Sequence, residues 1–335
     1  MCFYITNGYF TALHQGTRAT PPAIAAGEGA RAPYLDAAKV RLYFHTSKKT
    51  KEKRVGEGRV TSITFVKFDC KYTDRMGIMC TFAYMKKTVL ITGATSGIGQ
   101  ACARKFAENG DRLILTGRNE KRLADIKKHL AEKGSDVLTL TFDVRDREKA
   151  AKIIESLPAE WQEIDVLVNN AGLALGLEPE FEGNPDDWET MIDTNVKGLL
   201  TMTRLVVPGM VQRNRGHIIN VGSVAGDAAY AGGNVYCATK AAVKALSDGL
   251  RIDVANTAIR VTNLKPGLVE TNFSNIRFHG DHDRAANVYK GIKPLTGDDI
   301  ADVAVYAANA PAHVQIAEVL ILATHQASGS VIFRE

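Results

Sequence analysis

The chain has 335 residues, which is enough for one large α/β domain or two modest ones. Hydrophobic residues make up 45% of it, an ordinary share for a globular protein, and no apolar run reaches the roughly 18 residues of a membrane helix. The five cysteines form no CxxC pair and no zinc-ligand spacing, which indicates free thiols in a reducing compartment. We therefore expect a soluble, cytoplasmic protein that uses no metal and contacts no membrane.

The positive charge is confined to the first quarter of the chain. The net charge is +5, yet residues 1–84 hold 13 basic against 6 acidic side chains, and the remainder holds 29 against 31. The later part is thus slightly acidic, so its charge gives no reason to expect a nucleic-acid partner. The basic run "KKTKEKR" also lacks an aromatic stacking platform, which argues against single-strand binding.

Residues 1–84 show no periodic pattern that would bury a face. "TPPAIAAGEGARAP" is typical of a loop, and "RVTSITFVKF" is at best one isolated strand. We expect an N-terminal extension that is disordered or not part of the native protein. A targeting peptide is the second interpretation, although only Arg18 is basic among the first 27 residues, and an appended domain is the third.

From Met85 onward, buried-strand patterns alternate with helical patterns. Near-continuous apolar strands separated by helices indicate a parallel sheet covered on both faces. The sequence therefore predicts a single α/β domain over 85–335, with a doubly wound, Rossmann-type sheet. The predicted strands span 88–92, 112–116, 137–143, 165–169, 217–221, 259–264 and 318–322. The predicted helices lie near 98–109, 119–133, 147–156, 187–213, 235–255 and 298–308.

A glycine-rich loop, "TGATSGIG", follows the first predicted strand and opens the first helix. Glycines suit such a loop because they permit a tight turn, close backbone approach to a phosphate and close helix–strand packing. The helix N-terminus then offers free N–H groups and a partial positive charge to a pyrophosphate. The alternative is an ordinary glycine turn, but the position in a βαβ series favours a dinucleotide site at Gly93, Gly97 and Gly99.

The second predicted strand ends in "TGRNEKR", where Arg118 and Asn119 occupy the position that determines cofactor choice. Folds that bind NAD carry an acid there for the ribose 2′-hydroxyl, and this chain has none before Glu120. An arginine suits a 2′-phosphate, because its planar fork pairs with phosphate oxygens. The sequence favours NADP, with a solvated surface arginine as the alternative.

The next two strand ends also carry candidate cofactor contacts. Asp143 and Val144 end the third strand, where a carboxylate would accept from the adenine amino group or else cap the following helix. "NNAG" ends the fourth strand, and its small residues would let the backbone lie against the ribose and nicotinamide. The residues concerned are Asn170, Ala171 and Gly172.

Four polar residues form the candidate catalytic set. Ser223 lies just past the fifth strand, where open α/β sheets bind ligands. Tyr236 and Lys240 are four residues apart, so on a helix their side chains share a face. Asn195 sits in the middle of a predicted helix, where asparagine is a poor helix former.

Taken together, "TGATSGIG", "NNAG", Asn195, Ser223 and "YCATK" resemble the short-chain dehydrogenase/reductase family over roughly 86–325. More narrowly, "DDWETMIDTNVKG" and "YAGGNVYCATKA" resemble its NADP-dependent 3-hydroxy acid dehydrogenase branch, which includes serine 3-dehydrogenases and L-allo-threonine dehydrogenases. That branch often has a second arginine where this chain has Asn119. The resemblance also implies a homodimer or homotetramer, because long helices in such folds commonly pair across a two-fold axis.

The resemblance implies a role for each catalytic candidate. Tyr236 would be the base in oxidation and the acid in reduction, which requires its pKa to fall from about 10 to about 7–8. Lys240 and the oxidised nicotinamide would lower it, and Lys240 would also bind the ribose. Ser223 would bond the substrate oxygen, and Asn195 would hold a water that links Lys240 to solvent. The implied cofactor set is Gly93, Thr95, Ser96, Gly97, Ile98, Gly99, Arg118, Asn119, Asp143, Val144, Asn170, Ala171, Gly172, Tyr236, Lys240, Pro266, Gly267, Val269 and Thr271.

The segment after the sixth strand, near 267–295, is long enough to form a substrate flap. Within it, Arg277 lies between two apolar residues, an odd place for a solvated charge, and would bind a substrate carboxylate beside Ser223 and Tyr236. The alternative is pairing with Asp281 or with a neighbouring subunit. His279 is expected at the surface.

The expected function is NADP-dependent oxidation and reduction of small 3-hydroxy acids, the substrate being a small molecule. One alternative is a 3-oxoacyl-carrier-protein reductase, which would need a basic surface for the carrier that the slightly acidic domain does not offer. Another is a non-catalytic NADP-sensing protein, but such proteins usually lose the Tyr–Lys pair, which is intact here.

Overall fold

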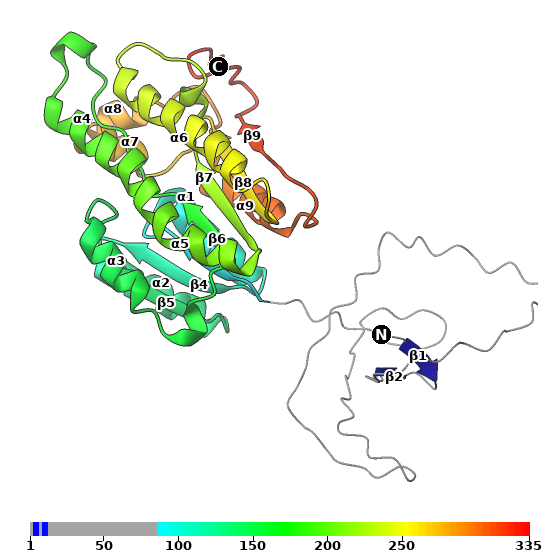
Figure 1. Cartoon of the computed structure of the whole chain (residues 1–335). Helices are drawn as coiled ribbons and strands as arrows, with labels where there is room; N and C mark the ends of the chain where they lie inside the picture. Colours follow the sequence, from blue (N-terminus) through cyan, green and yellow to red (C-terminus); the bar gives the residue numbers. More distant parts are fainter. Residues whose placement is uncertain (1–2, 7–8, 13–85) are drawn as a thin grey trace, which may run out of the picture. The chain divides into compact units, whose positions relative to one another are not determined.

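A seven-stranded, entirely parallel sheet forms the centre of the unit Lys86–Glu335, with strands in the order β5-β4-β3-β6-β7-β8-β9 (Figure 1). The structure is a computed structural model that describes residues 3–6, 9–12 and 86–335. The strands of this sheet are β3 Thr88–Ile91, β4 Arg112–Gly117, β5 Val137–Thr141, β6 Val166–Asn169, β7 Gly216–Val221, β8 Ile259–Pro266 and β9 Glu318–Ile321.

All seven predicted strands are present, and the doubly wound fold class is confirmed. The prediction works because a central parallel strand is covered on both faces and is therefore apolar at successive positions. In β3, for example, Val89, Leu90 and Ile91 are completely buried. The chain reverses its direction of sheet growth between β5 and β6, and this is where such folds bind ligands.

Helices cover both faces of the sheet and enclose two separate cores (Figure 1). On one face α1, α2 and α9 bury residues such as Phe106 and Ile300 against the strands. On the other, α3 and α5 bury residues such as Ile154 and Met202. These helices are α1 Gly97–Glu108, α2 Glu120–Glu132, α3 Arg147–Glu155, α4 Pro185–Ile192, α5 Leu199–Arg213, α6 Asn234–Asp253 and α9 Gly297–Asn309, with 3₁₀ turns at Ala159–Trp161, Glu180–Glu182 and Val224–Gly226.

The helix predicted over 187–213 is helical throughout, but it is not a regular α-helix. It consists of α4, a π-helical turn at Asp193–Gly198, and α5. π-helical turns are rare and occur frequently at functional sites, and this one contains the buried Asn195. The periodicity of a π turn is too close to that of an α-helix to be seen in the sequence.

Two short helices lie in the segment 267–295, which the sequence analysis described only as a flap. They are α7 Phe273–Arg277 and α8 His282–Asn287, and Phe278, which follows α7, and Ala285 of α8 are buried. Between them His279 adopts a φ of 51° and Gly280 a φ of 91°, the left-handed region in which glycine is favoured. Helices of five and six residues are too short to show a hydrophobic period.

Near the start of the chain, β1 Phe3–Thr6 and β2 Tyr9–Ala12 pair as a two-stranded antiparallel sheet that the sequence analysis did not predict. Residues 1–2, 7–8 and 13–85 lie outside the described part of the chain. The expectations for the 1–84 extension therefore fall almost entirely outside it. None of the helices in the described ranges is both long and apolar enough to cross a membrane.

Candidate active site

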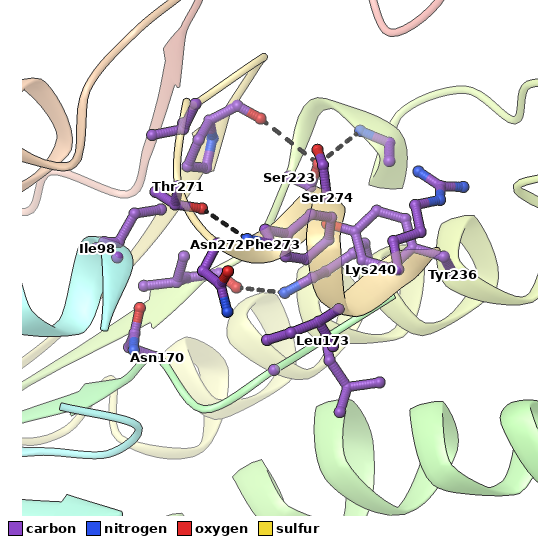
Figure 2. A pocket seen from close by; sticks show the side chains of 18 of the residues that line it. Ile98, Asn170, Leu173, Ser223, Tyr236, Lys240, Thr271, Asn272, Phe273 and Ser274 are labelled. Atoms are coloured by element: carbon purple, nitrogen blue, oxygen red, sulfur yellow. Dashed lines mark hydrogen bonds between the residues drawn. The ribbon is translucent and has the colours of Figure 1, made fainter. Parts of the chain in front are cut away.

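A cavity of about 480 Å³ opens at the carboxyl ends of the strands (Figure 2). It contains almost all of the residues that the sequence analysis proposed, although they come from segments far apart in the chain. Three of the proposed residues, Gly99, Asn119 and Asn195, do not line it. The proposed residues that do line it are Gly93, Thr95, Ser96, Gly97, Ile98, Arg118, Asp143, Val144, Asn170, Ala171, Gly172, Ser223, Tyr236, Lys240, Pro266, Gly267, Val269, Thr271 and Arg277.

The glycine-rich loop forms a cradle at one end of this cavity. Gly93 has a φ of 64°, and a Cβ built there would lie 2.9 Å from Ala171 Cα. Gly97 has a φ of 53°, so both positions are strained for any other residue. Gly99 contributes by packing, because a Cβ on it would lie 2.4 Å from the Gly93 carbonyl oxygen.

The N-terminus of α1 points its free N–H groups into this cradle. Ser96 is the N-cap residue, but its side chain makes no capping hydrogen bond, and the first turn holds no acidic residue. The N–H groups of the first turn therefore lack the side-chain partners that usually satisfy them. A helix N-terminus of this kind suits a phosphate group.

Arg118 and Asn119 follow β4 but differ in what they do. The Arg118 side chain is 64% exposed, and its Nη1 is 3.9 Å from an Asp143 carboxylate oxygen. Asn119 caps α2, because its Oδ1 accepts a hydrogen bond from the Arg122 backbone N–H at 2.9 Å. Of these two residues, Arg118 is the one whose N–H donors are exposed and can bind an anion.

Asp143 is bound by an arginine that the sequence analysis did not single out. Arg145 donates to both carboxylate oxygens, with Nη2 at 2.7 Å from Oδ2. Partial burial raises the pKa of Asp143, but the hydrogen bonds from Arg145 outweigh this and hold it below its usual value. The alternative role as a helix cap is wrong, since Asp146 caps α3 by accepting from Lys149 N–H.

Tyr236 and Lys240 lie on the first two turns of α6, on the same face as predicted, and Ser223 approaches from the end of β7 (Figure 2). All three side chains are buried. The Lys240 Nζ donates to the Val221 carbonyl at 2.8 Å and lies 5.9 Å from the centre of the Tyr236 ring. The Ser223 Oγ accepts a hydrogen bond from Ala225 N–H at 3.1 Å. It donates a longer and weaker one to the Pro266 carbonyl, at 3.4 Å.

The lowering of the Tyr236 pKa includes the charge of the oxidised nicotinamide, so it stays a prediction for the cofactor-bound enzyme. Burial raises the pKa above its usual value, although a hydrogen bond with Ser223 and the charge of Arg277 act in the opposite direction. Burial also lowers the pKa of Lys240 to about 8. The sequence shows which charges can be close, but it does not show how completely the tyrosine is removed from water.

Asn195 lies behind the cavity wall and ties two segments together. Its Oδ1 accepts from Leu173 N–H, and its Nδ2 donates to the Leu173 carbonyl, both at 2.8 Å. The same Nδ2 donates to Thr239 Oγ1 at 3.0 Å. A Cβ on Gly172 would be 3.1 Å from Asn195 Oδ1 and 3.5 Å from Lys240 Nζ, so the side chain is close to the lysine. Both amide hydrogens are used within the protein, and the water-holding role stays a prediction.

Arg277 enters the cavity from the end of α7. Its Nε donates to the Gly176 carbonyl and its Nη1 to the Tyr230 hydroxyl, each at 3.0 Å. Its Nη2 is buried and has no hydrogen-bond partner in the described part of the chain. The alternative pairing with Asp281 is not found: Asp281 caps α8 by accepting from Arg284 N–H, and among the described residues it forms no ion pair with Arg277. His279 is exposed, as expected, and contacts Asp187 at 3.0 Å.

Several lining residues were missed by sequence reasoning. Phe273 packs its ring edge-on against Tyr236, with ring centres 5.7 Å apart. Gln326, from the C-terminal segment, accepts from Leu268 N–H at 2.8 Å, and a Cβ on Gly267 would lie 2.1 Å from its Oε1. Tyr230 lies seven residues after Ser223, and its only sequence signal is the pair of glycines that follows. These contacts depend on tertiary folding and have no local pattern.

The geometry agrees with comparisons to known proteins. The family model for short chain dehydrogenases matches residues 87–281. A Salmonella typhi protein named NADP-dependent 3-hydroxy acid dehydrogenase YdfG is 56% identical over 229 residues, covering 68% of this chain and 91% of that protein. A Schizosaccharomyces pombe protein named NADP-dependent 3-hydroxy acid dehydrogenase is 46% identical over 251 residues, covering 74% and 97%.

Solved structures give the same result. A serine dehydrogenase described as a closed form complexed with NADP⁺ superposes with a TM-score of 0.71 at 48% identity, covering 74% of this chain and 99% of that one. The serine dehydrogenase from Escherichia coli gives a TM-score of 0.63 at 46% identity, covering 71% and 99%. With the parallel sheet, the glycine cradle and the buried Ser–Tyr–Lys set, these matches establish that the chain belongs to the short-chain dehydrogenase family.

Proposed function

We propose that this protein is an NADP-dependent dehydrogenase that oxidises the 3-hydroxyl group of small 3-hydroxy acids, including serine- or allo-threonine-like substrates, and reduces the 3-oxo acids in reverse. The observation that carries the proposal is one cavity that joins a phosphate cradle, a buried Tyr–Lys–Ser set and an arginine with an unpaired donor. The names of the similar proteins support the same substrate class.

The residues of the cradle fit NADP. The α1 N-terminus would hold the pyrophosphate, and Arg118 would pair with the 2′-phosphate from its exposed position. Asp143, Val144 and the Asn170–Gly172 turn would border the adenosine and the nicotinamide ribose. When bound, NADP⁺ supplies the hydride acceptor.

Tyr236 moves the proton. In oxidation its phenolic oxygen takes the proton of the substrate hydroxyl, and in reduction it returns that proton to the substrate oxygen. Burial favours the protonated phenol, so the free enzyme is prepared for the reductive direction. Oxidation requires a positive charge that stabilises the phenolate. Lys240 provides this charge while it is protonated, at pH values below its pKa of about 8.

Ser223 stabilises the substrate oxygen. Its donor bond to the Pro266 carbonyl is long, at 3.4 Å, so little is lost when the hydroxyl turns toward a substrate oxygen on which charge develops. Its other bond, from Ala225 N–H, keeps the oxygen in place during this change. Asn195 acts indirectly on the site. Its hydrogen bonds connect the Leu173 backbone to Thr239 on α6, the helix that carries Tyr236 and Lys240.

Arg277 is the proposed partner of the substrate carboxylate. Its guanidinium carbon lies 5.8 Å from the centre of the Tyr236 ring, which is near enough for one small molecule to contact both residues. No carboxylate of the described residues forms an ion pair with it. A buried donor without a partner is costly, and a substrate carboxylate would remove that cost.

Substitution of Arg277 by leucine is therefore expected to raise the KM for 3-hydroxy acids by about 10- to 100-fold, since a charge-assisted bond is lost, and to spare uncharged alcohols. Steady-state NADP⁺ reduction with 3-hydroxypropionate and 1-propanol measures the difference. Arg284→Leu is the matched control, because Arg284 lies on α8 and pairs with Glu178 outside the cavity. Equal losses on both substrates with Arg277→Leu would show that Arg277 is structural.

The function itself is tested with a substrate panel. Purified enzyme is supplied with NADP⁺ and, in turn, with L-serine, L-allo-threonine, 3-hydroxyisobutyrate, 3-hydroxypropionate and simple alcohols. The proposal requires the highest kcat/KM values among the 3-hydroxy acids. A clear preference for uncharged alcohols would overturn the proposed substrate class.

We also propose a cytoplasmic homodimer or homotetramer. Side chains such as Leu200, Val211 and Ile252 are exposed on α5 and α6, with Ile252 76% exposed. We expect these side chains to contact another copy of the chain, because exposed apolar surface often marks an interface. Sedimentation velocity would give a single species at two or four chain masses, and a monomer at micromolar concentration would contradict the proposal. Cell fractionation tests the location.

We propose that the catalytic unit begins near Met85. Contacts within the chain divide it at this point, into Met1–Met85 and Lys86–Glu335, and the matched family region starts at residue 87. Protein expressed from Met85 is expected to bind NADP and to keep full turnover, measured beside the 335-residue chain. Loss of turnover in the shorter protein would show that residues before Met85 contribute to the fold.

A further inference from the structure

Tyr230 is a half-buried cavity residue to which the proposed mechanism assigns no role. It lies on the loop between β7 and α6, which also carries Ser223 and leads directly into Tyr236. Its hydroxyl accepts a hydrogen bond from Arg277 Nη1 at 3.0 Å, and the Arg277 guanidinium carbon is 5.5 Å from the centre of its ring. The loop between β7 and α6 therefore holds Arg277, which comes from the 267–295 segment.

Two glycines make this position of Tyr230 possible. A Cβ on Gly233 would lie 2.1 Å from Cε2 of the Tyr230 ring, so any larger residue would displace the ring. Gly232 has a φ of 70°, and a Cβ there would lie 2.1 Å from the Leu177 carbonyl oxygen. The sequence "YAGG" therefore packs the ring against its own loop, and the hydroxyl has little freedom to move.

The polar atoms of the pair are only partly used. Arg277 donates from Nε to the Gly176 carbonyl and from Nη1 to the Tyr230 hydroxyl. Its Nη2 is buried and has no hydrogen-bond partner among the described residues. The Tyr230 hydroxyl accepts one hydrogen bond and donates none within the described ranges. Burial raises the pKa of Tyr230 although Arg277 acts in the opposite direction, so the hydroxyl keeps its proton. Nη2 and the Tyr230 O–H are thus two neighbouring donors from which no described residue accepts a hydrogen bond.

We propose that Tyr230 is a specificity-determining residue that fixes the Arg277 guanidinium and adds a second hydrogen bond to the substrate carboxylate. This inference rests on the proposed function, in which Arg277 binds that carboxylate. An arginine side chain has many rotamers, and a carboxylate held by one flexible group would tolerate substrates of several lengths. Anchoring the guanidinium to the loop of Ser223 and Tyr236 fixes the distance between the carboxylate and the reacting hydroxyl.

The consequence is a length selection that favours 3-hydroxy acids over 4-hydroxy acids. In 3-hydroxypropionate the hydroxyl carbon is separated from the carboxylate by one methylene, and in 4-hydroxybutyrate by two. With Tyr230 in place, only one of these lengths brings the hydroxyl to Tyr236 while the carboxylate contacts both donors. Removal of the Tyr230 hydroxyl releases the guanidinium, which can then adjust to the longer substrate.

The test is Tyr230→Phe, which keeps the ring that Gly233 accommodates. The ratio of kcat/KM for 3-hydroxypropionate to that for 4-hydroxybutyrate is expected to fall about tenfold, as for loss of one hydrogen bond to a charged group. The loss should appear in the KM for 3-hydroxypropionate, with turnover of 1-propanol and NADP affinity retained. Tyr289→Phe is the matched control, because its hydroxyl also lies in the cavity wall but bonds Ser274 and the Val269 carbonyl.

A double-mutant cycle separates positioning from a general structural effect. In the Arg277→Leu background, Tyr230→Phe should change the substrate ratio much less than it does alone, since no guanidinium is left to hold and only the direct hydrogen bond from the Tyr230 hydroxyl is lost. If the two changes multiply, or if Tyr230→Phe and Tyr289→Phe reduce all substrates alike, the inference is overturned. If Arg277→Leu alone fails to discriminate against carboxylates, the proposed function is at fault instead. The two failures are therefore distinguishable.

Discussion

Replacement of Tyr236 by phenylalanine is expected to reduce turnover by at least ~10²-fold while NADP affinity stays within a few-fold of the wild-type value. The phenylalanine keeps the ring contact with Phe273, where the ring centres are 5.7 Å apart, and removes only the group that moves the proton. Turnover is measured by NADP⁺ reduction with a saturating 3-hydroxy acid, and cofactor affinity by titration of the NADPH fluorescence.

The control for this substitution is Tyr306→Phe. Tyr306 lies on α9 and is 71% exposed, so the same loss of a hydroxyl should leave turnover unchanged. If Tyr236→Phe keeps turnover within tenfold of wild type, then Tyr236 does not transfer the proton and the mechanism is wrong.

Arg118→Asp is expected to weaken NADP binding by about 2–3 kcal/mol, or roughly 30- to 150-fold, and to make NAD the preferred cofactor. The substitution removes a cation that would pair with the 2′-phosphate. It also places a second carboxylate near Asp143, whose oxygen now lies 3.9 Å from the arginine. An aspartate at position 118, after the end of β4, would instead accept a hydrogen bond from the ribose 2′-hydroxyl of NAD.

Dissociation constants for NADP⁺ and NAD⁺ measure the effect. Arg122→Asp is the matched control, because Arg122 is an exposed residue in the first turn of α2 and does not line the cavity. An NADP⁺ affinity that Arg118→Asp leaves unchanged would mean that another group recognises the 2′-phosphate.

The strands and the catalytic spacing were predictable because their signals are local. The β3 strand is apolar throughout since both of its faces are buried, and the glycines of the loop are required by positive φ angles at Gly93 and Gly97. Tyr236 and Lys240 share a face because four residues make about one helical turn. Each of these features is determined by a short stretch of chain.

Other features depend on contacts between distant segments. The bond from Arg277 to Tyr230 spans 47 positions in the sequence, and the π-helical turn at Asp193–Gly198 looks like an ordinary helix in the sequence. The sequence also does not show that burial raises the Tyr236 pKa in the protein alone. Arg145 was overlooked because its pairing with Asp143 depends on how the chain turns after β5.

Isotope transfer tests the central claim most directly. The enzyme is supplied with NADP⁺ and with L-serine that carries deuterium either at C3 or at C2, and the NADPH formed is analysed by mass spectrometry. We expect one deuterium in the NADPH from C3-labelled serine, together with a slower rate, and none from C2-labelled serine. Deuterium from the C2 label, or NADPH without deuterium from the C3 label, would contradict oxidation of the 3-hydroxyl group.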